Sequence, residues 1–236
     1  MMKRLCSVCV RGGSKGVPNK NIRPLLGKPL LIYSLDQARQ SDLFDCIVVS
    51  SDSKEILQLA EEWGVDHAIE RPEELATDFA AKIPVFQHCF QTAETLSGMT
   101  FDTAVDLDAT SPLRNQDDLK GVVDLLESHD STTNVITGTT ARRSPYFNLV
   151  ELDESGRVYL SGKRSNIDGS IVRRQDAPPC FDMNASIYAW WRESLLNTTD
   201  HVIQFGTRLY LMPEERSVDI DSELDFRWVE FLMNNE

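Results

Sequence analysis

The chain has 236 residues and a formal net charge of −13, from 24 Lys and Arg against 37 Asp and Glu. Its apolar and charged fractions, 41% and 26%, are those of an ordinary soluble globular protein, and its length suffices for one sizeable core. So large a negative charge repels phosphate backbones and acidic lipids, which argues against nucleic acid or an anionic membrane as partner. The apolar run after Met1 is too short for a signal peptide or a membrane span, so we expect a cytoplasmic protein.

Short apolar runs that end in polar loops alternate with amphipathic helical patterns along the first half of the chain. Strands are predicted at 4–10, 45–52, 103–111 and 132–140. Helices are predicted at 29–41, 53–64, 81–96 and 115–129. This alternation is typical of βαβ units and predicts an α/β, doubly wound fold with a mainly parallel sheet. In such sheets ligands collect beyond the carboxyl ends of the strands, where the polar loops lie.

The alternation breaks at about residue 141. From there to about residue 180 the sequence is typical of short strands, turns and an extended loop, and strand-like periodicity resumes at 185–191. We therefore expect one domain over 1–236, with 141–180 as an excursion that forms a lid or pairs two subunits.

The stretch "CVRGGSKGVPNKN" is glycine-rich and cationic in an otherwise acidic protein. The first 30 residues contain seven basic and no acidic residues; the first acidic residue is Asp36. Gly12, Gly13 and Gly16 would let the backbone approach a ligand closely, and Arg11, Lys15 and Lys20 would neutralise phosphate oxygens. The spacing matches neither the Walker pattern nor G-x-G-x-x-G, and the loop alone could be a surface turn. The charge segregation favours a polyphosphate site.

Five motifs in order carry a resemblance to a known family. They are "VRGGSKGVPNKNIRPLLGKPLL", "FDCIVVSSDSKEI", "RPEELATD", "ATSPLR" and "SVDIDSELD", spread from about residue 4 to residue 233. The chain thereby resembles the acylneuraminate cytidylyltransferases. The resemblance implies a nucleotidyltransferase fold, usually a homodimer, in which CTP and a 2-keto sugar acid become a CMP-sugar and pyrophosphate with Mg²⁺.

The resemblance also implies site residues. The first loop would hold the CTP triphosphate through Arg11, Gly12, Gly13, Ser14, Lys15 and Lys20, with Arg71 and Asp78 in the nucleotide pocket. The sugar would be bound by Asp108, Thr110, Ser111, Asn184 and Arg174. The metal would be bound by Asp219 and Asp221, and the residues credited with catalysis are Arg11, Lys20 and Asp221.

The acidic pair also makes chemical sense without the resemblance. Two aspartates at i and i+2 on a strand face the same side and would give a hard cation two oxygen ligands. The alternative is a strand end followed by the N-terminus of a helix that starts near Ser222, where carboxylates are common. The basic loop elsewhere in the chain favours the metal role.

Asp108 is a departure from the family pattern. Relatives specific for N-acetylneuraminate have Gln where this chain has Asp108, and "DLDATSPLR" is similar to bacterial CMP-legionaminic acid synthetases. A carboxylate accepts hydrogen bonds but donates none, and it repels the sugar's own carboxylate unless it faces hydroxyl or N–H groups. We predict a legionaminic-type substrate. N-acetylneuraminate or pseudaminate remains an alternative, as does a metal-binding role for Asp108.

Some of the remaining residues are expected to have packing or surface roles only, and for others two roles are possible. The thiols Cys6 and Cys9, the four histidines, the "AWW" at 189–191 and Phe226, Trp228 and Phe231 are expected to be packing residues or, for the histidines, surface residues. The arginines of the excursion could reach a neighbouring subunit's sugar or be solvated: Arg142, Arg143, Arg173 and Arg174. A non-catalytic CTP-binding regulator would not need Asp219 and Asp221, so an enzyme is the preferred interpretation.

Overall fold

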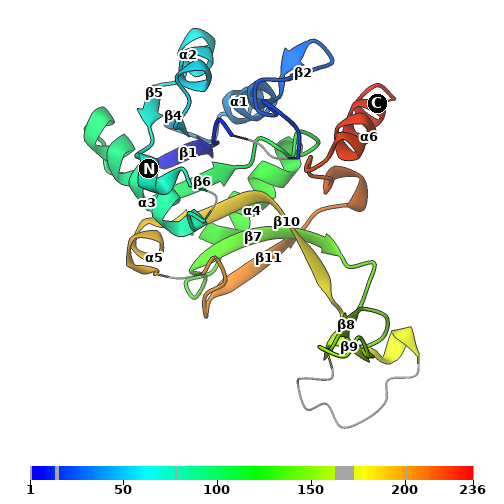
Figure 1. The fold of residues 1–236 in the computed structure, drawn as a ribbon. Helices are drawn as coiled ribbons and strands as arrows, with labels where there is room; N and C mark the ends of the chain where they lie inside the picture. The colour runs from blue at the N-terminus through cyan, green and yellow to red at the C-terminus, as the bar shows by residue number, and fades with distance from the viewer. Residues whose placement is uncertain (1, 14–15, 78, 163–172, 200, 236) are drawn as a thin grey trace.

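A computed structural model describes residues 2–13, 16–77, 79–162, 173–199 and 201–235. Seven strands form the central sheet, in the order β11-β7-β10-β6-β1-β4-β5 (Figure 1). Their bounds are β1 Arg4–Cys9, β4 Cys46–Ser51, β5 His67–Glu70, β6 Thr103–Leu107, β7 Asn134–Thr140, β10 Phe181–Trp191 and β11 Thr207–Leu211. β10 runs antiparallel to both of its neighbours, and the other four pairings are parallel. The α/β, mainly parallel fold predicted from the sequence is confirmed.

Helices cover both faces of this sheet. Their bounds are α1 Leu30–Gln40, α2 Lys54–Trp63, α3 Lys82–Ser97, α4 Gln116–Glu127, α5 Arg192–Asn197 and α6 Glu223–Met233. One apolar cluster joins the sheet to α1, α2 and α4, and a second joins its other face to α3 and α5. Along β1 the side chains alternate between the two, since Leu5 belongs to the second cluster and Cys6 to the first. The sheet is therefore the middle layer of three.

A third apolar cluster fixes the C-terminal helix near the N-terminal loop. Ile220, Phe226 and Val229, from α6 and the segment before it, pack with Val17, Leu25 and Leu30. The last two lie in and beside a small hairpin of β2 Pro24–Leu25 and β3 Lys28–Pro29. Figure 1 shows α6 on the same side of the molecule as this hairpin. The segment after β1 and the C-terminal helix therefore pack together here.

The excursion contains a second hairpin outside the main sheet. It comprises β8 Val150–Leu152 and β9 Val158–Leu160, followed by a short 3₁₀ helix at Arg174–Asp176. Figure 1 shows this hairpin projecting from the end of β7 and β10. Two further 3₁₀ turns lie at Glu73–Leu75 and Glu214–Arg216. Among the described residues, no helix has the length and apolar character to cross a membrane.

Two sequence-based expectations are wrong. The segment before α6, residues 217–221, forms no strand but an irregular stretch that ends at the Ser222 N-cap. On α6, Phe226 is buried as expected, but Trp228 and Phe231 are about half exposed and stack on each other with their ring centroids 5.5 Å apart. Cys6 is buried in the core and Trp190 likewise, as predicted.

Candidate active site

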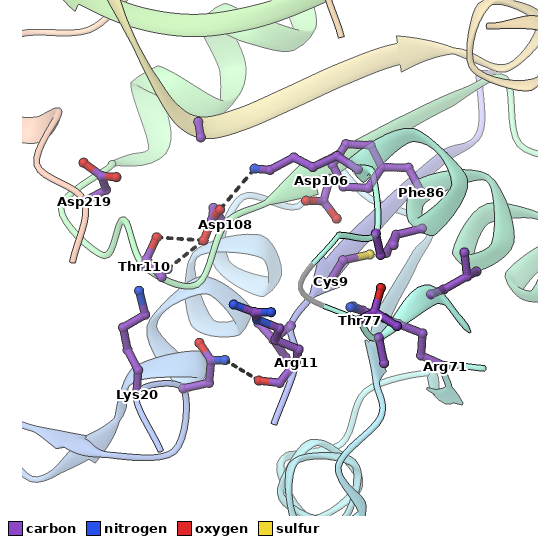
Figure 2. Close-up of a pocket in the computed structure, with 18 of the residues that line it drawn as sticks. Cys9, Arg11, Lys20, Arg71, Thr77, Phe86, Asp106, Asp108, Thr110 and Asp219 are labelled. Atoms are coloured by element: carbon purple, nitrogen blue, oxygen red, sulfur yellow. Dashed lines mark hydrogen bonds and ion pairs between the residues drawn. The ribbon is translucent and has the colours of Figure 1, made fainter. Parts of the chain in front are cut away.

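A pocket of about 500 Å³ lies at the carboxyl ends of β1 and β6. Its wall is assembled from the loop after β1, the segment between β5 and α3, the end of β6 and the segment before α6. Figure 2 shows Lys20 and Asp219 on one side, Arg71 and Thr77 on the other, and Arg11 and Asp108 between them. This is the position that the strand pattern predicted for a ligand.

The basic loop lies against the acidic segment. The Lys20 ammonium donates to the Ile220 carbonyl and lies 3.3 Å from Asp221 Oδ1. A Cβ added at Gly16 would overlap the carbonyl oxygen of Asp221, so only glycine permits this backbone approach. The contacts join positions about 200 residues apart in the chain. The structure thus brings the predicted triphosphate loop and the predicted metal residues to one place.

The start of the loop is held by hydrogen bonds to its backbone. Asn21 Nδ2 donates to the Arg11 carbonyl at 3.0 Å, and the Gly12 N–H donates to Asp52 Oδ1 at 2.8 Å. Arg11 and Lys20 both line the pocket, whereas Gly12 and Gly13 are absent from its described lining. Ser14 and Lys15 lie outside the described residues. The described part of the loop therefore presents two cationic side chains.

Arg71 supplies a buried cation at the other side of the pocket. Its guanidinium donates to the Ser50 carbonyl through Nη2 at 2.9 Å, while its Nε is buried with no hydrogen-bond partner among the described residues. A buried donor without a partner is costly unless a ligand accepts from it. Thr77 lines the same side of the pocket. The predicted partner Asp78 falls outside the described residues.

Asp108 accepts two hydrogen bonds and forms one ion pair on the pocket wall. Thr110 donates to its Oδ1 from the backbone at 3.0 Å and from the hydroxyl at 2.8 Å (Figure 2), and Lys82 Nζ lies 3.5 Å from Oδ2. Burial raises the pKa of Asp108, but Lys82 and the Thr110 donors outweigh burial, and the pKa is lowered. The carboxyl is therefore ionised at neutral pH.

Two predicted sugar residues do not line the described pocket. Ser111 is buried beside it, and the Asn184 side chain is used within the core, accepting from Thr137 Oγ1 at 2.7 Å and from the Ser186 N–H at 3.2 Å. Its neighbour Ala185 lines the pocket instead, with a φ of 54°. The side chain of Arg174 lies outside the description. Of the predicted sugar set, the described pocket contains Asp108 and Thr110.

Arg114 is a buried positioning residue that the sequence analysis did not single out. Its Nη1 donates to the carbonyls of Asp108 at 2.9 Å and Ser186 at 2.8 Å, and its Nε donates to Gln37 Oε1 at 2.9 Å. Burial lowers the pKa of Arg114 to about 10, which still leaves it charged at neutral pH. The loop that carries Asp108 and Thr110 is thereby tied to β10 and α1. Its place at the end of "ATSPLR" was the available signal.

Asp219 and Asp221 both line the pocket, and Asp221 lies beside the ammonium of Lys20. Burial, and after it the neighbouring charge of Asp221, raises the pKa of Asp219. The described residues contain no group of three His, Cys, Asp or Glu side chains placed to hold a metal. Two carboxylates that repel each other nevertheless suit Mg²⁺, which keeps several waters and takes substrate phosphate oxygens as further ligands. The donor set fits that ion.

Asp106 is a buried carboxyl on the same wall, two residues before Asp108. It is 6% exposed and accepts from Ser7 Oγ at 2.6 Å. Burial raises its pKa from 3.8 to about 6. A charged residue inside the apolar run "TAVDLD" was the sequence signal for it. Lys82 was also not among the predicted site residues. It lines the pocket near the carboxyl groups of Asp106 and Asp108 and the hydroxyl of Tyr188.

Comparisons with known proteins show similarity to cytidylyltransferases. A family model described as "Cytidylyltransferase" matches residues 6–168. The CMP-N,N'-diacetyllegionaminic acid synthase of Campylobacter jejuni is 43% identical, covering 99% of this chain and 96% of that protein. The post-translational flagellin modification protein B of Campylobacter coli is also 43% identical, covering 100% and 97%. A solved CMP:2-keto-3-deoxy-manno-octonic acid synthetase complexed with CTP shares the fold, with a TM-score of 0.70 at 16% identity over 99% of each chain.

Asp106 generates a prediction about stability. Since its pKa is about 6 in the folded protein against an ordinary 3.8, the folded state binds more protons between these values. Stability therefore falls as pH rises through this window and stays reduced above it. Asp106→Asn, which keeps an acceptor for Ser7, should remove this loss and stabilise the protein by at most about 3 kcal/mol above pH 7.

Urea unfolding of both proteins from pH 4 to 8 checks this prediction. The difference in unfolding free energy should grow up to about pH 6–7 and then level off. Asp130→Asn, at an exposed position, is the matched control and should show no such growth. A difference for Asp106→Asn that does not change with pH would contradict the prediction.

Proposed function

The chain belongs to the cytidylyltransferase family, and from that premise we propose that it joins CTP to a legionaminic-type nonulosonic acid. It is a nucleotidyltransferase of the CMP-sugar acid synthetase kind. The products are the CMP-sugar and pyrophosphate. The observation that carries the proposal is the meeting of Arg11 and Lys20 with Asp219 and Asp221 in one pocket. Because CTP is an intracellular metabolite, we propose a cytoplasmic location as part of the same proposal.

The reaction requires positioning and charge neutralisation more than covalent chemistry by the protein. The sugar hydroxyl attacks the α-phosphorus, the bond from that phosphorus to the bridging oxygen breaks, and pyrophosphate leaves while the hydroxyl proton passes to solvent. Arg11 and Lys20 neutralise the triphosphate oxygens in this account, and Lys20 exchanges its contact with Asp221 for the nucleotide. Arg71, which lines the opposite side of the pocket, gives the nucleotide a further cation.

Asp219 and Asp221 would hold Mg²⁺ in this proposal. The ion, when bound, supplies Lewis-acid stabilisation of phosphate charge and lowers the pKa of a coordinated hydroxyl. Ionised carboxylates are needed for that role, and both side chains lie at the pocket surface. A non-catalytic CTP-binding regulator would keep the basic loop without any use for this pair, which disfavours that alternative.

Asp108 supports the choice of sugar. Its carboxylate is already bound by Thr110 and Lys82, which favours a hydrogen-bonding role toward the sugar over direct metal ligation. An acceptor here suits a sugar that presents hydroxyl or N–H donors, as diamino nonulosonic acids do. CMP-N-acetylneuraminate or CMP-pseudaminate synthesis is the alternative within the same class.

We further propose a homodimer paired through the excursion. In the β8–β9 hairpin, Val150 lies opposite Leu160 and Leu152 opposite Val158, so these four side chains share one face. Three of them are more than half exposed, at 52%, 65% and 65% for Val150, Leu152 and Val158. A two-stranded hairpin with an uncovered apolar face is marginal alone, and a twofold-related copy would cover it.

The first prediction that tests the proposed function is catalytic activity. Purified protein with CTP, Mg²⁺ and a nonulosonic acid should release pyrophosphate, and EDTA should stop the release. Asp221→Asn should lower turnover on the order of a hundredfold with an unchanged circular dichroism spectrum, because charge stabilisation at the phosphates is lost. Lys20→Ala should weaken both CTP binding and turnover. Exposed Asp130→Asn is the control, and normal turnover in both site variants would sink the assignment.

The second prediction concerns the sugar. At fixed CTP, legionaminate should be turned over with a higher kcat/KM than N-acetylneuraminate, pseudaminate, KDN or Kdo, because Asp108 needs donors to bind. Initial rates of pyrophosphate release measure the panel. Equal or better use of N-acetylneuraminate would overturn the choice of sugar. Loss of activity toward every sugar in Asp108→Gln would point to the metal role.

The third prediction concerns assembly. Sedimentation should give a dimer, and Leu152→Glu combined with Val158→Glu should shift it to monomer by placing charges on the apolar face. Glu154→Lys, at the exposed turn of the same hairpin, is the matched control and should remain dimeric. A fully active monomeric wild type would refute pairing through this arm.

A further inference from the structure

Lys82 occupies a position that helix stability does not explain. It is the first residue of α3, whose N-cap Ala81 makes no side-chain cap and whose first turn has no acidic residue. A cation at a helix N-terminus is opposed by the helix dipole. The side chain is 46% exposed, and it lies along the pocket wall. Its location therefore calls for an explanation at the pocket.

The contacts of Lys82 are directed at one wall. Its Nζ lies 3.5 Å from Asp108 Oδ2 and 3.4 Å from Tyr188 Oη, and 4.6 Å from the centre of the Tyr188 ring. An ammonium has three donors, and these two polar contacts leave one for a ligand. Asp108 Oδ2 accepts no hydrogen bond from Thr110, which uses Oδ1. A donor and an acceptor thus stand side by side at the pocket surface.

We propose that Lys82 is a specificity-determining residue that, paired with Asp108, binds one hydroxyl of the sugar acid. That hydroxyl would donate to Asp108 Oδ2 and accept from Lys82 Nζ, and a separation of 3.5 Å between the two allows one oxygen to reach both. The charge of Lys82 also offsets that of Asp108, so the wall tolerates the carboxylate that every such substrate carries. The inference rests on the proposed function and specifies how the sugar acid of that reaction is recognised.

A double-mutant cycle tests the pair, with KM for the sugar acid and for CTP measured separately. Lys82→Met should raise the KM for the sugar acid on the order of tenfold or more, since Asp108 is left uncompensated, and should leave the KM for CTP within about twofold. Asp108→Asn alone should also raise the sugar KM. The double variant should be less impaired than the product of the two single effects, because both charges leave together.

Lys120→Met, on an exposed position of α4 away from the pocket lining, is the matched control and should change neither KM. Circular dichroism and thermal unfolding establish that each variant is folded. An unchanged sugar KM in Lys82→Met, a comparable rise in the KM for CTP, or strictly multiplicative effects in the double variant would each overturn the role of the pair. A folded wild type that turns over no sugar acid would overturn the proposed function itself, and with it this role.

Discussion

The candidate active site depends on the packing of the C-terminal helix against the loop that follows β1. Ile220, Phe226 and Val229 bury apolar surface with Val17 and its neighbours, and this contact places the acidic segment beside the basic one. The Lys20 contact with the Ile220 carbonyl and the Gly16 backbone approach to Asp221 are short-range consequences of it. Without that hydrophobic contact, two carboxylates and a cationic loop would be separate, solvated surface features with little mutual attraction.

Strand and helix positions could be predicted from sequence periodicity, because the apolar residues of each element recur at the spacing that puts them on its buried face. The positions of β1, β4, α1 and α2 match the predicted ranges within two residues, since hydrophobic period and terminal signals agree there. The antiparallel direction of β10 was not predictable, because pairing is a long-range choice and its alternation fits either direction. Asp219 and Asp221 line the pocket, although the strand that was expected to carry them does not form.

Site residues divided along similar lines. Arg11 and Lys20 stand in a basic segment whose composition departs from the rest of the chain, and Asp219 and Asp221 were singled out through the resemblance to the family. Lys82 and Asp106 had neither signal: each is one charge within an ordinary amphipathic or apolar run. Their importance arises from neighbours brought in by folding, such as Tyr188 from β10 and Ser7 from β1, and these are invisible to local pattern.

Asp106 and Asp108, two positions apart at the carboxyl end of β6, show how strongly the surroundings of a carboxyl group determine its pKa. Asp106 is the more deeply buried of the two on the pocket wall, so burial prevails and its pKa rises to about 6. Asp108 lies one step further out, where Lys82 and Thr110 prevail over burial and its pKa falls. Both carboxyls are therefore mainly ionised above about pH 7, but the outer one is the stronger acid and lies beside the ammonium of Lys82. In the proposed function, this wall would offer the sugar a strong hydrogen-bond acceptor, Asp108, whose negative charge is offset by Lys82. Local pairing of opposite charges of this kind would allow a protein with a formal charge of −13 to bind the two anionic substrates of the proposed reaction.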